Sequence, residues 1–139
     1  MLMLALFMTA ASMTTPPMQR RHVDFLHACH SGDLLRVHRT IVNAYEEHVD
    51  ALDSGLLLSS GQGHLHVMHY LIEIGAGGLD LALYSAAVHN QVGSCKFLIS
   101  KDRDYPASDI ELALSGAGKH NSYDAEFYLL TQINTPRPS

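Results

Sequence analysis

The sequence has few cysteines, few basic residues and few charged residues of either sign, and each shortage argues against a class of protein. Two cysteines, Cys29 and Cys95, cannot build a disulfide framework, and so low a number is typical of a reducing compartment. Nine lysines and arginines against fourteen acidic residues leave a formal net charge of −5, whereas a general nucleic-acid binder needs a basic face. We therefore expect a cytoplasmic protein without a nucleic-acid partner.

Charged residues make up 17% of the chain and hydrophobic residues 47%, a balance that excludes a disordered acidic tail. The 139 residues match the usual size of one domain. A chain of this length buries enough of its surface to fold without disulfide bonds.

The first 13 residues are apolar and carry no charge. This stretch is shorter than the roughly 20 residues of a membrane-spanning helix, so we expect no membrane span. The small residues Ala10 and Ala11 fit a cleaved signal peptide, which would make the protein secreted, but no Lys or Arg precedes the apolar stretch. The alternatives are an apolar cap on the first repeat and a disordered segment.

Between its ends the chain repeats itself. Four segments align on one glycine or asparagine each, at Gly32, Gly63, Asn90 and Asn121, with spacings of 31, 27 and 31 residues. We expect a turn here because these residue types tolerate the left-handed backbone region.

The residues before each turn predict a first short helix. An apolar anchor is followed, three and four positions later, by two small residues that allow close helix packing. The anchors and pairs are Phe25 with Ala28-Cys29, Leu56 with Ser59-Ser60, Leu83 with Ala86-Ala87, and Leu114 with Ala117-Gly118.

The residues after each turn predict a second helix with one buried stripe, because apolar residues recur three and four apart. In the first three units these residues are Leu34, Val37 and Ile41; Leu65, Met68, Leu71 and Ile72; and Val92, Cys95, Leu98 and Ile99.

The second unit, SSGQGHLHVMHYLIEIGA, resembles an ankyrin repeat in its small residues, its Gly-His-Leu turn, its aliphatic helix and its closing Gly-Ala. The third, LYSAAVHNQVGSCKFLISKD, resembles another, and the first and fourth look like opening and closing repeats. The resemblance implies an all-α, ankyrin-like helical repeat solenoid of about four helix-turn-helix units over residues 22–133. An apolar segment and linker, residues 1–21, precedes this domain, and a tail, residues 134–139, follows it.

The chain also departs from the ankyrin pattern. No unit has the Thr-Pro-Leu-His start, and the spacings fall below the usual repeat of about 33 residues. The family builds protruding β-hairpin fingers between units, so we expect short fingers here. Glu126 stands where the fourth unit should be apolar. Short, divergent repeats of this kind are similar to those of large DNA viruses.

Two sequence features resemble catalytic motifs without completing them. The run at 116–119, Gly-Ala-Gly-Lys, lacks the earlier glycine and the following Ser or Thr of a phosphate-binding loop. Cys29 lies between His27 and His30, but neighbouring residues of a helix point apart and rarely form a thiolate–imidazole pair. We expect Cys29 and Cys95 to be buried structural thiols.

Histidine spacing supports an alternative, a histidine-rich zinc-dependent protein or enzyme. His27 and His30 are three residues apart, as are His66 and His69, with His64 nearby. No cysteine pair or carboxylate completes either set, so we expect no metal and no cofactor. The paired carboxylates Glu46 with Glu47, and Asp102 with Asp104, are typical of a solvated face.

The ankyrin resemblance implies a non-enzymatic protein–protein interaction module that binds its partner on the concave face. By position, that face carries His27, His30, Ser31, Leu58, Gln62, Ser85, Val88, His89, Lys119 and His120. Its histidines would gain positive charge as the pH falls. If the chain is viral, the resemblance implies interception of a host signalling protein.

Five tyrosines divide into two expected groups. Tyr45, Tyr84 and Tyr105 are candidates for exposed aromatic contacts, because tyrosine is enriched in binding hot spots. Tyr70 and Tyr128 stand beside aliphatic helix residues and are expected in the core.

The end units of a repeat stack must hide their apolar faces. The N-terminal segment would do so as a cap, and a homodimer through the first unit is the alternative.

Overall fold

We describe residues 17–101 and 105–134 of a computed structural model of the chain. Within these ranges every regular element is a helix, which confirms the predicted all-α class. The elements are α2 (Pro17–Ser31), α3 (Leu34–His48), the 3-10 helix η1 (Val49–Ala51), α4 (Leu52–Gln62), α5 (Leu65–Glu73), α6 (Leu79–Val88), α7 (Val92–Lys101), α8 (Ala107–Lys119) and α9 (Tyr123–Asn134).

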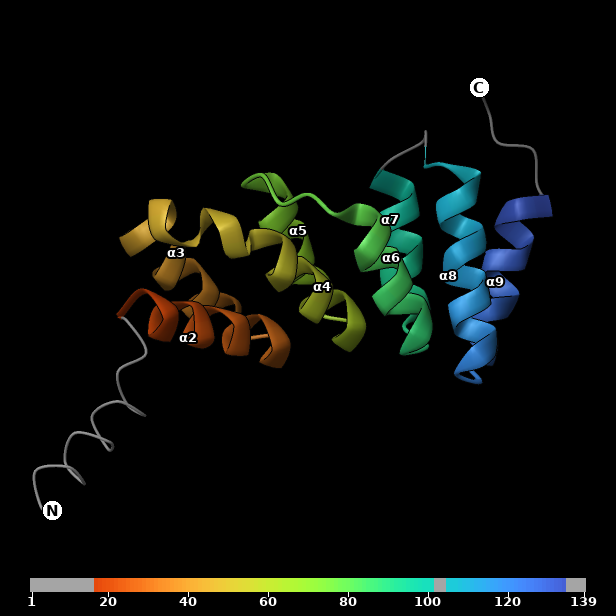
Figure 1. Cartoon of the computed structure of the whole chain (residues 1–139), viewed down its shortest axis with the longest axis horizontal. Helices are drawn as coiled ribbons and strands as arrows, with labels where there is room; N and C mark the ends of the chain where they lie inside the picture. Colours follow the sequence, from red (N-terminus) through yellow and green to blue (C-terminus); the bar gives the residue numbers. More distant parts are fainter. Residues whose placement is uncertain (1–16, 102–104, 135–139) are drawn as a thin grey trace, which may run out of the picture.

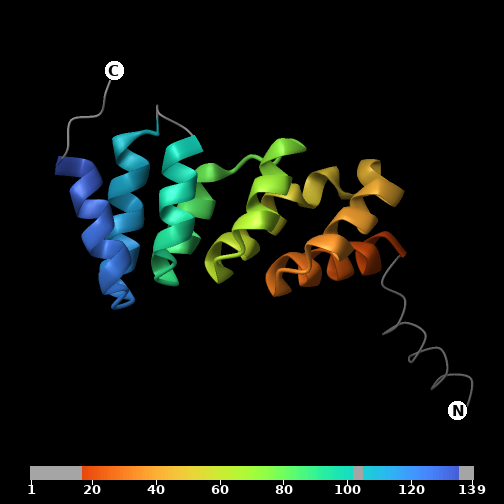
Figure 2. The ribbon, with the colours of Figure 1, turned by 180° about the vertical axis from the view of Figure 1, so that it is seen from behind.

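The α-helices form four consecutive antiparallel pairs, α2 with α3, α4 with α5, α6 with α7, and α8 with α9. The first helices of the pairs, α2, α4, α6 and α8, contact one another in that order, and we call them the first-helix row. The second helices, α3, α5, α7 and α9, likewise follow one another and form the second-helix row. Figures 1 and 2 show the α2–α3 pair at one end of the line and the α8–α9 pair at the other.

The four turn residues adopt the left-handed backbone that the sequence predicts. Their φ angles are 81° at Gly32, 78° at Gly63, 59° at Asn90 and 58° at Asn121. Each stands two residues before the start of a second helix. Only glycine and asparagine occur here because other side chains are strained at positive φ.

The same type of backbone hydrogen bond closes each of the four turns. The residue after the turn donates its N–H to a carbonyl five residues earlier, in the arrangement of a Schellman motif. The bonds run from Asp33 to Ala28, His64 to Ser59, Gln91 to Ala86 and Ser122 to Ala117, at 2.8 to 3.0 Å. The small residue at the acceptor position is therefore fixed in the same place in every pair.

Small residues let the first helices approach closely. The predicted small pairs are completely buried in α2, α4 and α6, as is Ala117 in α8. Gly118 is exposed because α8 ends the row in the described part of the chain. At Gly55, a Cβ would lie 2.9 Å from the sulfur of Cys29 and 3.1 Å from the ring of Phe25. The α2–α4 contact thus requires glycine.

The second helices bury most of the residues predicted for the apolar stripe. The prediction is wrong for the first stripe residue of the first two units. Leu34 and Leu65 are 37% and 40% exposed, because each is the first residue of its helix, beside the turn. In the fourth pair Ala125 and Leu129 are fully buried, whereas Glu126 is half-buried. The buried face of α9 therefore consists of Ala125 and Leu129, and Glu126 lies outside the core.

The connections between pairs are short where the structure describes them. The 3-10 helix η1 joins α3 to α4 directly, and residues 74–78 link α5 to α6 without a strand. The carboxylate of Asp53 accepts a 2.6 Å hydrogen bond from the Gly77 N–H and so holds this link against α4.

The structure corrects three further predictions, which concern Tyr105, the pair Tyr70 and Tyr128, and the start of helix α2. Tyr105 is only 3% exposed and its hydroxyl donates to the Leu79 carbonyl, so it anchors the chain before α8 and is not a surface contact. Tyr70 and Tyr128 are half-buried at the edge of the core. Helix α2 begins at Pro17, inside the predicted linker, because proline suits the first position of a helix. The N-terminal apolar stretch, residues 1–13, and the tail, residues 135–139, lie outside the described residues.

Because α2 and α4 approach closely at Gly55, a glycine-to-alanine substitution should have opposite effects on stability at Gly55 and at the open position Gly93. Gly55→Ala should lower the free energy of unfolding by about 1–3 kcal/mol, because Cys29 and Phe25 are completely buried and cannot move aside. Gly93→Ala, where a Cβ meets nothing within 4 Å, should raise it by up to about 1 kcal/mol. Urea denaturation of both variants measures this, and equal effects would contradict the packing.

Candidate partner-binding surface

The structure brings the predicted partner-binding residues to one series of adjacent helix ends. Seven are exposed, namely His27, His30, Ser31, Gln62, His89, Lys119 and His120, and three are half-buried, namely Leu58, Ser85 and Val88. All belong to the C-terminal halves of α2, α4, α6 and α8 or to the residue that follows. Because these helices are neighbours in the first-helix row, the ten residues form a common surface, which we call the first-helix surface.

Contacts between pairs confirm that these helix ends are adjacent. The hydroxyl of Ser85 in α6 donates to the Leu57 carbonyl of α4 at 3.1 Å. A Cβ at Gly61 of α4 would lie 2.7 Å from the Ser85 hydroxyl and 3.1 Å from the ring of His89. Glycine at position 61 therefore leaves the room that His89 occupies.

Two of the surface histidines also form hydrogen bonds with backbone carbonyls near the C-terminal ends of their own helices. Nδ1 of His89 lies 2.8 Å from the Ser85 carbonyl, and Nδ1 of His120 lies 2.9 Å from the Gly116 carbonyl. A carbonyl can only accept, so Nδ1 carries the hydrogen in both rings and Nε2 is the acceptor while the ring is neutral. Each histidine stands just before a turn residue, where a donor satisfies the last carbonyls of the helix.

Polar side chains just after two of the turns form hydrogen bonds with the preceding helix pair. Nε2 of His64 donates to the His30 carbonyl at 2.9 Å, and the hydroxyl of Ser122 donates to the Val88 carbonyl at 2.6 Å. Both acceptors stand two residues before a turn. The sequence interpretation missed this role, although the sequence shows a polar residue directly after every turn residue.

Both thiols lie in the core. Cys29 and Cys95 are completely buried, and desolvation raises the pKa of each to about 12. This confirms the expectation of structural thiols, because the nucleophilic form of cysteine is the thiolate. The Gly-Ala-Gly-Lys run at 116–119 lies inside helix α8, where it cannot form a phosphate-binding loop.

The histidines of the second unit have separate contacts. His64 reaches α2, whereas His69 lies 3.7 Å from the Glu73 carboxylate and edge-on to the ring of Phe97. In the described part of the chain, no group of three His, Cys, Asp or Glu side chains is arranged to hold a metal ion. Asp102 and Asp104 lie outside that part.

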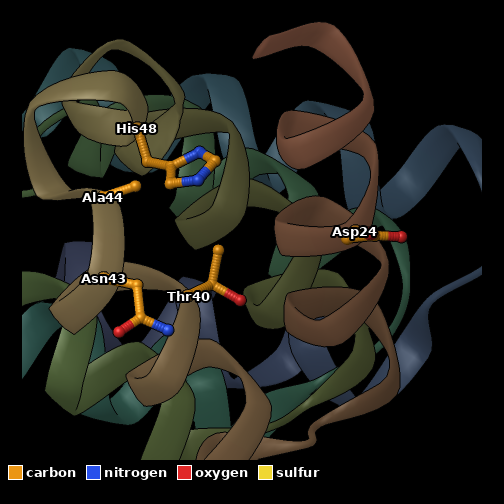
Figure 3. Close-up of a pocket in the computed structure, with 5 residues that line it drawn as sticks. All are labelled: Asp24, Thr40, Asn43, Ala44 and His48. Atoms are coloured by element: carbon orange, nitrogen blue, oxygen red, sulfur yellow. The ribbon is translucent and has the colours of Figure 1, made fainter. Parts of the chain in front are cut away.

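A separate cavity of about 310 Å³ lies between α2 and α3, at Asp24, Thr40, Asn43, Ala44 and His48. Figure 3 shows the Asp24 carboxylate directed away from the ring of His48. That carboxylate lies 3.7 Å from the guanidinium of Arg36 instead. Asp24 and His48 therefore do not form a carboxylate–imidazole pair suited to acid–base chemistry.

The ring of His48 is completely buried beside the cavity. It stacks on Phe25 at a ring-centroid distance of 5.4 Å and is tilted against His22 at 5.0 Å. Nothing in the sequence pattern indicated this cluster.

Comparisons with known proteins add no relative. No protein-family model, no curated protein and no solved structure matches the chain. None of the described helices has the length and apolar character needed to cross a membrane.

The raised thiol pKa values predict slow chemical modification. At pH 8 neither Cys29 nor Cys95 should react with a thiol reagent in the folded protein, because both remain protonated and buried. Both should react at once in guanidinium chloride, which serves as the control. Rapid modification of either thiol in the native protein would contradict the burial.

The separated histidines predict that the protein binds no stoichiometric zinc. Metal analysis of untagged protein should give well under one zinc per chain. The contrary result is one zinc per chain that is lost in a His27→Gln, His30→Gln variant, and it would revive the zinc alternative.

Proposed function

We propose that the chain is an ankyrin-like helical repeat solenoid that acts as a non-enzymatic protein–protein interaction module. The observation that carries this proposal is the shared geometry of the four helix pairs. Each pair has the same left-handed turn residue and the same closing hydrogen bond, and each contributes side chains to the first-helix surface. Repeated helix pairs typically offer such an extended surface to a partner.

The chemistry of the described residues supports binding over catalysis. A nucleophile, a base and an orienting group must lie within hydrogen-bond distance of one another in an enzyme site. Here both thiols are buried and protonated, and the histidines of the surface donate to backbone carbonyls of their own helices or lie exposed.

The first-helix surface favours a protein partner with complementary hydrogen-bonding groups. Its histidines, serines and glutamine offer donors and acceptors, and Lys119 adds the one formal positive charge. Leu58 and Val88 are half-buried between these polar groups and supply apolar contact area. We place the interaction in the cytoplasm and, for a viral chain, assign a host signalling protein as the partner.

The test replaces two exposed histidines at neighbouring helix ends. A His30→Glu, His89→Glu double variant should lose capture of the partner from native cells, because it places two negative charges on the surface. Affinity capture followed by mass spectrometry identifies the partner, and a titration with the purified partner should show at least about tenfold weaker binding.

The matched control is His66→Glu, which makes the same exchange at an exposed position of α5 in the second-helix row. It should leave partner binding unchanged, and the circular dichroism of all variants should match the parent chain. Undiminished binding by the double variant would exclude the first-helix surface as the docking face.

A further inference from the structure

Every junction between neighbouring pairs of the second-helix row has one side-chain contact in common. Six residues after its turn residue, each pair presents a side chain to the aromatic ring seven residues after the next turn. His38 meets Tyr70 at a ring-centroid distance of 5.5 Å, His69 meets Phe97 at 6.1 Å, and Lys96 Nζ lies 5.6 Å from the ring centroid of Tyr128. All three junctions therefore have the same register.

The junction between α7 and α9 shows which other positions line this contact. A cavity of about 350 Å³ there is lined by Val92 and Lys96 of the earlier pair and by Asp124, Phe127, Tyr128 and Thr131, all of α9. Counted from the turn residues, the lining uses positions 2 and 6 of the earlier pair and positions 3, 6, 7 and 10 of the later pair. Position 6 of the later pair also faces the next junction, so we call positions 2 and 6 of the earlier pair, and positions 3, 7 and 10 of the later pair, the junction positions.

The two ends of the molecule carry large exposed apolar side chains at the junction positions. On α9 these are Tyr123 and Phe127, which are 69% and 72% exposed. On α3 they are Leu35 and Val42, which are 60% and 66% exposed. The remaining junction position of α3 holds the exposed cation Arg39.

Inside the molecule three of the matching positions are largely polar, whereas the residues equivalent to Tyr123 are apolar and those equivalent to Arg39 are aromatic. The residues equivalent to Phe127, Leu35 and Val42 in the other pairs are His38, His69 and Lys96; His66, Gly93 and Asp124; and Glu73, Ser100 and Thr131. An apolar side chain replaces these only where a junction has no neighbour within the described chain. Exposed apolar patches at such places mark interaction sites.

We propose that the α8–α9 end of one copy binds the α2–α3 end of a second copy, in the register of the internal junctions. This register places the Phe127 ring against Arg39 of the second copy. The contact repeats the Lys96–Tyr128 pair with the aromatic and cationic partners exchanged, and it gains the attraction of a cation for a ring face. Tyr123 then covers Leu35, whereas Val42, about 10 Å further along α3, lies at the far end of the contact.

The first-helix row leaves space for a side chain in the same register. Between α2 and α4, Gly55 faces Cys29 and Phe25. The equivalent positions of the two ends are Asp24 on α2 and Gly118 with Leu114 on α8. Gly118 is exposed and leaves room for the Asp24 side chain, which is 65% exposed. Lys119 stands beside Gly118, and the Glu126 carboxylate oxygens lie 3.7 and 4.0 Å from where a Cβ of residue 118 would be, so charges of both signs face this position.

A second copy suits both ends at once, whereas a symmetric contact does not. If two α9 helices met, Leu35 and Val42 would stay in water. A contact that joins different surfaces of two copies does not close after two chains, so the copies add one after another. The average mass in solution should therefore rise steadily with protein concentration.

The test blocks one end at a time. Phe127→Lys and Val42→Glu should each reduce self-association by at least about tenfold, because the lysine would face the cation Arg39 of the second copy and the glutamate would be buried in an apolar contact. Each variant keeps one unaltered end, so their mixture should form a one-to-one heterodimer and nothing larger. Sedimentation velocity over a series of concentrations measures all three samples and the parent chain.

Leu81→Glu is the matched control, because Leu81 is 58% exposed on α6, in the middle of the molecule. Its self-association should equal that of the parent chain. Tyr123→Glu and Arg39→Glu form a second blocking pair if either first variant fails to fold.

Three results would overturn the proposal. They are a parent chain that remains monomeric at every concentration, a Val42→Glu variant that still dimerises, and a mixture of blocked variants that stays monomeric. A Val42→Glu dimer would instead indicate contact between two α9 helices.

Discussion

A short helix pair cannot bury its own apolar face, and every other feature of this protein follows from that constraint. The first helices carry small residues so that neighbours approach within contact distance, and Gly55 is the extreme case because a Cβ there would overlap Cys29. Hydrophobic burial is non-directional, so close packing alone would not fix the order of the pairs. Order comes from polar contacts that recur in register, such as those of His64 and Ser122 with the preceding pair.

The two rows of helices have different tasks in this account. The first-helix row ends in a polar surface whose histidines are held by hydrogen bonds to their own helices, and this surface suits recognition of another protein. The second-helix row carries the contacts between pairs, from His38 with Tyr70 to Lys96 with Tyr128. The proposed partner binding and the proposed self-association therefore use different parts of the molecule, with Lys119 close to both.

The sequence predicted the fold well where the physics is local. Positive φ at Asn90 and Asn121 follows from residue type, and the burial of Phe25 follows from its spacing to small residues. Features that depend on distant neighbours were missed. Tyr105 looks like a surface aromatic until its hydroxyl is seen to reach Leu79, and His48 has no periodic signal that indicates its place in the core. The predicted surface residues were placed by register, and seven of the ten are exposed while three are half-buried.

The recurrence of the contacts between pairs is the central claim, and nuclear Overhauser contacts in solution test it most directly. The account predicts cross-peaks between the side chains of His38 and Tyr70, of His69 and Phe97, and of Lys96 and Tyr128. It also predicts none that skip a pair, such as His38 with Phe97. Absence of the sequential contacts, or contacts between pairs that are not neighbours, would show that the helices do not stack as a repeat.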